Sequence, residues 1–301
     1  MRIVVGVSPD ESGEDGLALG ALLARLLDAR ITLAFVHPPT MDYPSLGNVD
    51  AEWESFLRER SAAALDHAAE ILRTQWSIDD VDTLGVARTS VGHGLRDAAD
   101  EVGALVIVIG PGSEGVDGHL ALGSVAHSLL HGGAAAVALA PEGYREVAPD
   151  AIERLVVGFQ DTPESEYAVT IAESVTRPHG LPLHLLTVVL RMTRILGARI
   201  GRDPERMVME ALVEHERAAQ QGFIDRSGLP LTGSVVEGDT AGRAMSRFDW
   251  QDADVFVAAS SSLGVLSRVF LGDLTHKLLR ACTVPAVVLP RGFDPDGRMD
   301  S

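Results

Sequence analysis

A glycine-rich segment that follows an apolar run carries the most specific chemical pattern in the sequence. Gly110, Gly112 and Gly115 have the spacing G-x-G-x-x-G, which in dinucleotide-binding proteins lets the backbone approach a pyrophosphate. That motif normally opens a strand–helix–strand unit and is followed, about 20 positions later, by an acidic residue for the ribose. Here two further glycines delay the next helix, and no acidic residue stands at that distance. We therefore do not assign a dinucleotide site.

The same segment contains a second pattern, Gly110-x2-Ser113-x9-Gly123-Ser124. A glycine at the end of a strand lets the backbone approach a phosphate without a Cβ in the way. A Gly-Ser pair at the start of a helix offers free backbone N–H groups, a hydroxyl and the positive end of the helix dipole. Such a site needs no lysine. The pattern favours phosphate binding, and a purely structural glycine-rich turn is the alternative.

Other chemistries find little support in the sequence. A P-loop needs a lysine after its second glycine, and the only lysine of the chain is Lys277. Pro111 stands where the first glycine of a G-x-S-x-G nucleophile elbow would precede Ser113. We interpret the ten histidines as surface or helix residues and expect no metal site. Asp10 and Glu11 do not form a convincing water-activating base, so we assign no catalytic residue.

An internal repeat organises the chain. Residues 2–12 resemble residues 154–165, and residues 122–141 pair with 271–290 without a gap. A chain of 301 residues is also long enough for two domains of ordinary size. We predict two domains, at 1–145 and 146–293, with a linker at 142–151.

Within each half, short Val/Ile-rich runs alternate with helix-length amphipathic segments, which predicts parallel strands with helical crossovers. In the first half we expect strands at 2–7, 31–36, 82–88, 104–109 and 135–140, and helices at 12–28, 50–76, 93–102 and 121–131. In the second we expect strands at 153–159, 182–189, 231–237, 254–259 and 285–289, and helices at 163–177, 203–226, 240–249 and 271–281. Each half is thus an α/β domain with a doubly wound, five-stranded parallel sheet. Its ligand site belongs at the carboxyl ends of the strands.

These patterns, in this order, resemble the universal stress protein family, whose fold is similar to that of the adenine nucleotide alpha hydrolases. The resemblance rests on the V-V-G-V opening at 4–7, the strand 32–37 leading into a proline, the 110–124 loop, and the closing Val-rich strand that ends in proline. It covers nearly the whole chain twice. It implies a cytoplasmic adenine-nucleotide-binding regulator of a stress response, with ATP, accompanied by magnesium, as the ligand.

The resemblance also implies which residues form the site. In the first half they are Ser8, Val36, Gly110, Ser113, Gly123 and Ser124. Two positions depart from the pattern of the ATP-binding relatives. Ser113 stands where the family has its second glycine, and Ser8, like Gln160 in the second half, stands where relatives carry an aspartate. Serine and glutamine can still form hydrogen bonds but supply no charged acceptor.

The second half departs further, since its loop reads Ala259-x2-Ser262-x9-Gly272-Asp273. Asp273 stands where Ser124 stands in the first half. A carboxylate against phosphate oxygens is a like-charge contact, although aspartate is also a good helix N-cap. We therefore expect the nucleotide mainly in the first half.

Five arginines lie between the second strand and second helix of the second half: Arg191, Arg194, Arg199, Arg202 and Arg206. Our hypothesis is that they contact acidic residues or an anion over the cleft of that half. A solvated face is the alternative.

Composition limits the partners. There are 25 basic and 43 acidic residues, and a net charge of -18 opposes nucleic-acid binding. A single cysteine, Cys282, excludes an internal disulfide and suits a reducing compartment. Neither an export signal nor an apolar run of about 20 residues is visible, so we expect a cytoplasmic protein without a membrane partner.

The last strands of the two halves, 135–140 and 285–289, are apolar and prone to lie at a sheet edge. We predict that they pair and make the chain an intramolecular pseudo-dimer, as this edge does in relatives. Association of two whole chains into a homodimer is a further expectation. Two alternatives to a nucleotide-binding regulator stay open: a family member that acts through protein contacts without a nucleotide, and a weak ATPase.

Overall fold

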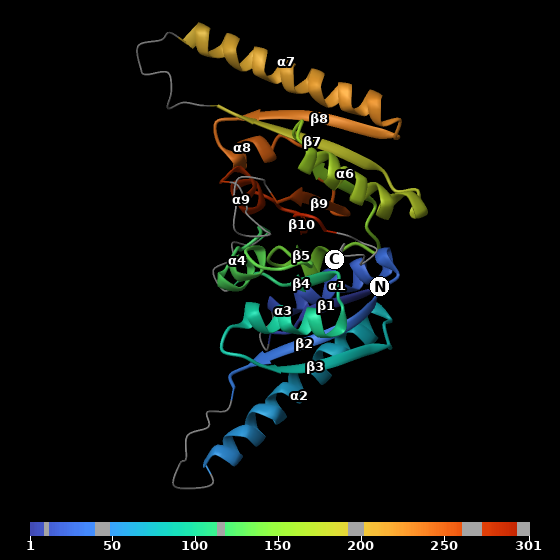
Figure 1. The fold of residues 1–301 in the computed structure, drawn as a ribbon, viewed down its shortest axis with the longest axis vertical. Coiled ribbons are helices and arrows are strands. Elements are labelled where there is room, and N and C mark those ends of the chain that lie inside the picture. Colours follow the sequence, from blue (N-terminus) through green and yellow to red (C-terminus); the bar gives the residue numbers. More distant parts are fainter. Residues whose placement is uncertain (9–11, 40–48, 113–117, 192–201, 261–272, 294–301) are drawn as a thin grey trace.

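The computed structural model describes residues 1–8, 12–39, 49–112, 118–191, 202–260 and 273–293. They form one ten-stranded sheet with helices on both faces (Figure 1). The first half contributes β1 (Arg2–Gly6), α1 (Ser12–Leu27), β2 (Arg30–His37), α2 (Val49–Trp76), β3 (Val81–Ala87), α3 (Val91–Val102), β4 (Val106–Ile109), α4 (Ser124–Leu130) and β5 (Ala136–Leu139). Each expected strand and helix of this half is present, with ends that differ by a few residues.

The second half repeats this order after a short helix α5 (Tyr144–Val147). Its elements are β6 (Arg154–Gly158), α6 (Pro163–Thr176) with a 3₁₀ turn η1 (Arg177–His179), β7 (Leu183–Leu190), α7 (Arg202–Ser227), β8 (Leu231–Gly238), α8 (Ala241–Met245), β9 (Asp254–Ala259), α9 (Asp273–Arg280) and β10 (Ala286–Leu289). The predicted α/β class with doubly wound halves is confirmed.

The strand order is β3-β2-β1-β4-β5-β10-β9-β6-β7-β8. All strands within a half run parallel, and the two halves meet where β5 pairs antiparallel with β10. Ala286 lies opposite Leu139 at this junction, and Val288 opposite Val137. The predicted pairing of the two last strands is therefore confirmed. It converts two apolar strand edges into the middle of a continuous sheet.

Apolar side chains of the strands point alternately to two core layers, as the two-residue period of a strand requires. Ile3 and Val5 pack with α1, α2 and α6 on one face, and Val4 packs with α3, α4, α8 and α9 on the other. Both layers run across the β5–β10 junction. Among the described residues, no helix is both long and apolar enough to cross a bilayer.

The structure corrects two predicted helices and the linker. The helix expected at 121–131 begins only at Ser124, and the one expected at 240–249 ends at Met245, whose carbonyl accepts a hydrogen bond from Trp250 Nε1. The linker contains α5. Its amino end is held by Asp15 of α1, whose carboxylate accepts hydrogen bonds from the backbone N–H groups of Gly143 (3.0 Å) and Arg145 (2.9 Å). Burial raises the pKa of Asp15, against the effect of these two hydrogen bonds.

A buried polar cluster lies in the second half beneath α8. His184 of β7 contacts the hydroxyls of Thr232 (Nδ1, 2.7 Å) and Ser234 (Nε2, 3.0 Å) on β8. Nearby, Arg154 forms a bidentate ion pair with the buried Asp254. The pKa of His184 is lowered, chiefly by burial and then by the Arg154 charge, while Asp254 acts in the opposite direction.

We expect His184 to make the chain less stable in mildly acidic solution. Because its pKa is lowered in the fold, the unfolded chain takes up the proton first as the pH falls through the ordinary value of 6.5. The free energy of unfolding should therefore decrease below that pH and be unaffected by this residue above it. Urea unfolding at pH 8 and pH 5 checks this, with His184→Gln as the variant. An equal pH dependence in parent and variant would exclude this role for His184.

Candidate functional site

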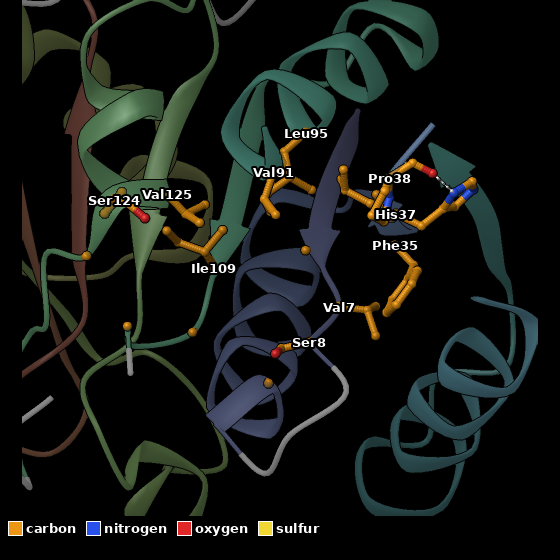
Figure 2. Close-up of a pocket in the computed structure, with 18 of the residues that line it drawn as sticks. Val7, Ser8, Phe35, His37, Pro38, Val91, Leu95, Ile109, Ser124 and Val125 are labelled. Carbon is orange, nitrogen blue, oxygen red and sulfur yellow. Dashed lines mark hydrogen bonds between the residues drawn. The ribbon is translucent and has the colours of Figure 1, made fainter. Parts of the chain in front are cut away.

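A cavity of about 520 Å³ lies at the carboxyl ends of the strands in the first half, next to the neighbouring β1 and β4 (Figure 2). The chain passes from β1 to β2 on one side and from β4 to β5 on the other. Doubly wound folds bind their ligands at the point where the connections diverge in this way. Its walls come from the ends of β1, β2 and β4, from the loop that leads to α4, and from α2, α3 and the first turn of α4. A cavity of this size suits a ligand as large as a nucleotide.

The structure brings five of the six predicted site residues to this cavity. They are Ser8 after β1, Val36 of β2, Gly110 after β4, Gly123 before α4, and Ser124 at the start of α4. The sixth, Ser113, lies outside the described residues. Figure 2 shows Ser124 near Val125 and Ile109, and Ser8 apart from them, near Val7; all five residues line the cavity.

Glycine is favoured in the loop after β4 because two segments of the backbone lie close together there. A Cβ added to Gly112 would lie 3.1 Å from Cα of Gly123, and one added to Gly123 would lie 3.3 Å from Cα of Gly112. Gly123 has an extended backbone (φ -70°, ψ -176°) that any residue can adopt. The preference for glycine therefore comes from close packing and not from backbone strain. The backbone segments around Gly112 and Gly123 lie between the end of β4 and the start of α4.

A second close approach involves α1. A Cβ on Gly16 would lie 2.8 Å from the backbone nitrogen of Gly110, so α1 contacts the end of β4 directly. In the repeat, the counterpart of Gly110 is Ala259, which lines a cavity together with Ala168 of α6. The sequence pattern pointed to Ala259 but not to its partner on the preceding helix.

No side chain caps the amino end of α4. Gly123 is its N-cap residue, and the described structure gives it no side-chain cap hydrogen bond. Its carbonyl accepts the first helical hydrogen bond, from the N–H of His127 (3.0 Å). The next three residues, Ser124, Val125 and Ala126, all line the cavity. Their N–H groups belong to the first turn of α4. N–H groups in the first turn of a helix have no acceptor within that helix.

The charge of the cavity differs from that of the chain. Among the described residues that line it, Arg60 of α2 is the one charged side chain, and none is acidic. The chain as a whole has a net charge of -18. A wall free of carboxylates does not repel an anion.

Sequence reasoning missed the residues that α2 and α3 contribute. Trp53, Phe56 and Arg60 of α2, and Val91 and Leu95 of α3, line the cavity (Figure 2 shows the α3 pair). Their helices read as ordinary amphipathic segments. The signal that was available is the pair of large aromatic residues in the first turns of α2, with a positive charge four residues after the second of them.

The second half has a smaller described cavity, of about 200 Å³, beside α6, Ala259 and Ser260; Glu164 and Arg291 also line it. Asp273 is the first residue of α9, in the place that Ser124 has in α4. The side chain of Asp273, and Ser262 and Gly272, lie outside the described residues.

Of the five arginines at positions 191–206, the side chains of Arg191 and Arg206 lie among the described residues. Arg191 lies 3.7 Å from Glu237 of β8, and Arg206 lies 3.7 Å from Glu210 on the same helix. Both contact carboxylates, but neither Glu237 nor Glu210 lines the described cavity of this half, and the second pair is an exposed one along α7. Arg194, Arg199 and the side chain of Arg202 lie outside the described residues.

Two histidines at the end of α4 have a helical spacing that sequence reasoning overlooked. His127 and His131 are four residues apart, and their ring centroids are 4.1 Å apart. Nδ1 of His131 lies 2.7 Å from the carbonyl oxygen of His127. Within the described part of the chain, no group of three or more His, Cys, Asp or Glu residues could hold a metal ion.

The fold and the cavity define a class of α/β proteins, with a doubly wound parallel sheet and a cavity at its switch point, present here as two repeats in one chain. The family model described as "Universal stress protein family" matches residues 1–141 and again 151–290. The chain therefore belongs to the universal stress protein family, as a tandem member.

Similar proteins agree with this assignment. A universal stress protein of Mycobacterium tuberculosis is 31% identical over 298 residues, which covers 96% of this chain and 100% of that protein. One from Mycolicibacterium smegmatis is 25% identical, covering 95% and 96%. A solved universal stress protein structure from Archaeoglobus fulgidus has a TM-score of 0.65 at 16% identity and covers 97% of this chain and 98% of that one. At this identity the structural likeness establishes the fold.

Proposed function

We propose that the protein is an adenine-nucleotide-binding regulator of a stress response, with ATP bound in the first half. The observation that carries the proposal is the cavity of about 520 Å³, where five predicted residues from three strand ends and the start of α4 meet. The close packing of Gly112 against Gly123, and the uncapped first turn of α4, suit a phosphate chain beside the loop. The apolar walls of β2 and α3 suit the base and ribose.

The described lining also bears on magnesium. It contains no carboxylate, and Mg²⁺ is normally held by one or two carboxylates together with substrate phosphates. None of the described lining residues would therefore contribute a carboxylate ligand, and the phosphates would hold the ion.

Equilibrium binding of ATP to nucleotide-free protein, measured by titration calorimetry with and without magnesium, tests the proposal. We expect saturable binding of one ATP per chain. Absence of binding by ATP, AMP and adenosine would contradict it and favour a family member that acts through protein contacts. Phosphate release above that of a Gly123→Asp variant would instead add slow hydrolysis to the binding function.

A positive charge at the cavity wall should favour the charged part of the ligand. We expect Arg60→Gln to weaken ATP binding about fivefold, as loss of an exposed charge interaction worth up to about 1 kcal/mol implies, with adenosine binding little changed. Arg58→Gln is the matched control, because Arg58 pairs with Glu54 on the same helix and does not line the cavity. Equal losses for ATP and adenosine would argue against a charge effect.

A further inference from the structure

Four side chains of α2 line the cavity from one face of that helix. Trp53, Phe56, Leu57 and Arg60 follow the spacing i, i+3, i+4, i+7, which places them on one side of a helix. Further along α2, the buried stripe of the helix passes through Leu57, Leu65 and Leu72. At about 100° per residue, Trp53 and Phe56 lie to one side of this stripe. Figure 1 shows α2 running out past the β3 edge of the sheet towards its first turns.

Because Trp53 and Phe56 lie beside the buried stripe, on turns of α2 beyond the β3 edge of the sheet, α2 does not bury them against the core. Trp53 is 49% exposed and Phe56 48% exposed, whereas Leu57 beside them is buried. Large apolar groups that are left open at a cavity commonly mark a place where another molecule binds. The chemistry of the two rings indicates which kind of molecule.

The rings of Trp53 and Phe56 are stacked on each other. Their centroids are 5.5 Å apart, and the ring planes differ by 24°. The phenyl ring therefore covers one face of the indole and restricts its orientation. The opposite face of an indole is a flat, sequence-tolerant surface for another planar ring, such as a nucleotide base.

The second half lacks this set of residues. The buried positions of the two long helices align when Leu57 is matched with Met209, and Ala68 with Gln220. In that alignment Trp53, Phe56 and Arg60 correspond to Glu205, Val208 and Leu212. The aromatic pair and the positive charge thus occur only in the half that also keeps Gly16 and Gly110. Both features distinguish the same half.

We propose that Trp53, held in place by Phe56, is the platform on which the base of the bound nucleotide stacks. This inference rests on the proposed function and adds a binding residue from α2 to a site otherwise built by strand ends and α4. Stacking uses the face of the base and not its hydrogen-bonding edge. Trp53 should therefore strengthen the binding of ATP and GTP to a similar extent.

Three variants test this platform by calorimetry and by tryptophan emission during an ATP titration. We expect Trp53→Ala to weaken ATP binding about 10-fold, in line with the loss of one stacked base, and to remove most of the ligand-induced change in emission. Trp53→Phe keeps a ring, so it should bind ATP within about threefold of the parent but also lose the emission change. Trp76→Phe, at the other end of the same helix and outside the cavity, should keep both.

The outcomes separate this inference from the function on which it rests. If ATP binds the parent and Trp53→Ala equally, or if the emission change persists in Trp53→Phe, the platform is wrong while nucleotide binding stands. If ATP does not bind the parent at all, the proposed function is wrong and the platform with it. Far-ultraviolet circular dichroism of each variant checks that it is folded, as expected for a half-exposed side chain.

Discussion

Replacing Ser124 by aspartate is expected to weaken ATP binding about 100-fold or more. Ser124 opens α4 and lines the cavity beside Gly110 and Gly123. A carboxylate placed there would face the phosphates, and two like charges about 4 Å apart at an effective dielectric constant of about 20 repel by about 4 kcal/mol. The same change also puts into the first half the residue that the second half carries naturally, Asp273. Titration calorimetry on the purified variant measures the loss.

Two further variants serve as controls for Ser124→Asp. Ser124→Ala removes the hydroxyl without adding charge, so we expect a loss of about 10-fold or less, typical of one hydrogen bond. Asp273→Ser should leave ATP binding unchanged or create a weak second site. If Ser124→Asp binds ATP like the parent while changes in the second half remove binding, the nucleotide has been assigned to the wrong half.

The largest loss of stability is expected for Asp254→Ala. Asp254 is only 1% exposed, and its carboxylate oxygens accept hydrogen bonds from Nε (2.7 Å) and Nη2 (2.6 Å) of Arg154. It also accepts one from the N–H of Gln251 (2.9 Å). Removing the carboxylate leaves the partly buried guanidinium without its partner. We expect the free energy of unfolding to fall by about 3 kcal/mol or more, measured by urea denaturation.

The first half supplies a matched control. Arg2 is the counterpart of Arg154 in the repeat, and it pairs with Asp82 at 2.8 Å, but both side chains of that pair are more than a third exposed. Asp82→Ala should therefore cost about 1 kcal/mol or less. Similar losses for Asp82→Ala and Asp254→Ala would show that burial of the Arg154–Asp254 pair adds nothing to the free energy of unfolding. Replacing Arg154 and Asp254 together by Met and Leu should cost less than Asp254→Ala alone, because no unpaired charge remains.

Part of the site could be predicted from the sequence because its chemistry is local. Gly110, Gly123 and Ser124 lie within one loop, and their spacing alone suggests a backbone that can approach phosphate. Trp53, Phe56 and Arg60 could not be assigned this way. Their i, i+3, i+7 spacing is that of one face of any helix, and only the packing of α2 on the sheet decides which face is buried and which lines the cavity.

The sequence by itself determined the two repeats, the alternation of strands and helices, and the apolar edge strands. Each of these depends on residue type and short-range periodicity, which reflect burial at neighbouring positions. Tertiary structure alone decided three contacts between distant segments. They are the register that places Ala286 opposite Leu139, the close approach of Gly16 to Gly110, and the hydrogen bonding of Asp15 to the amino end of α5. Such contacts depend on where separate elements come to rest in space. A one-dimensional pattern does not contain that information until the sheet and its helices have packed.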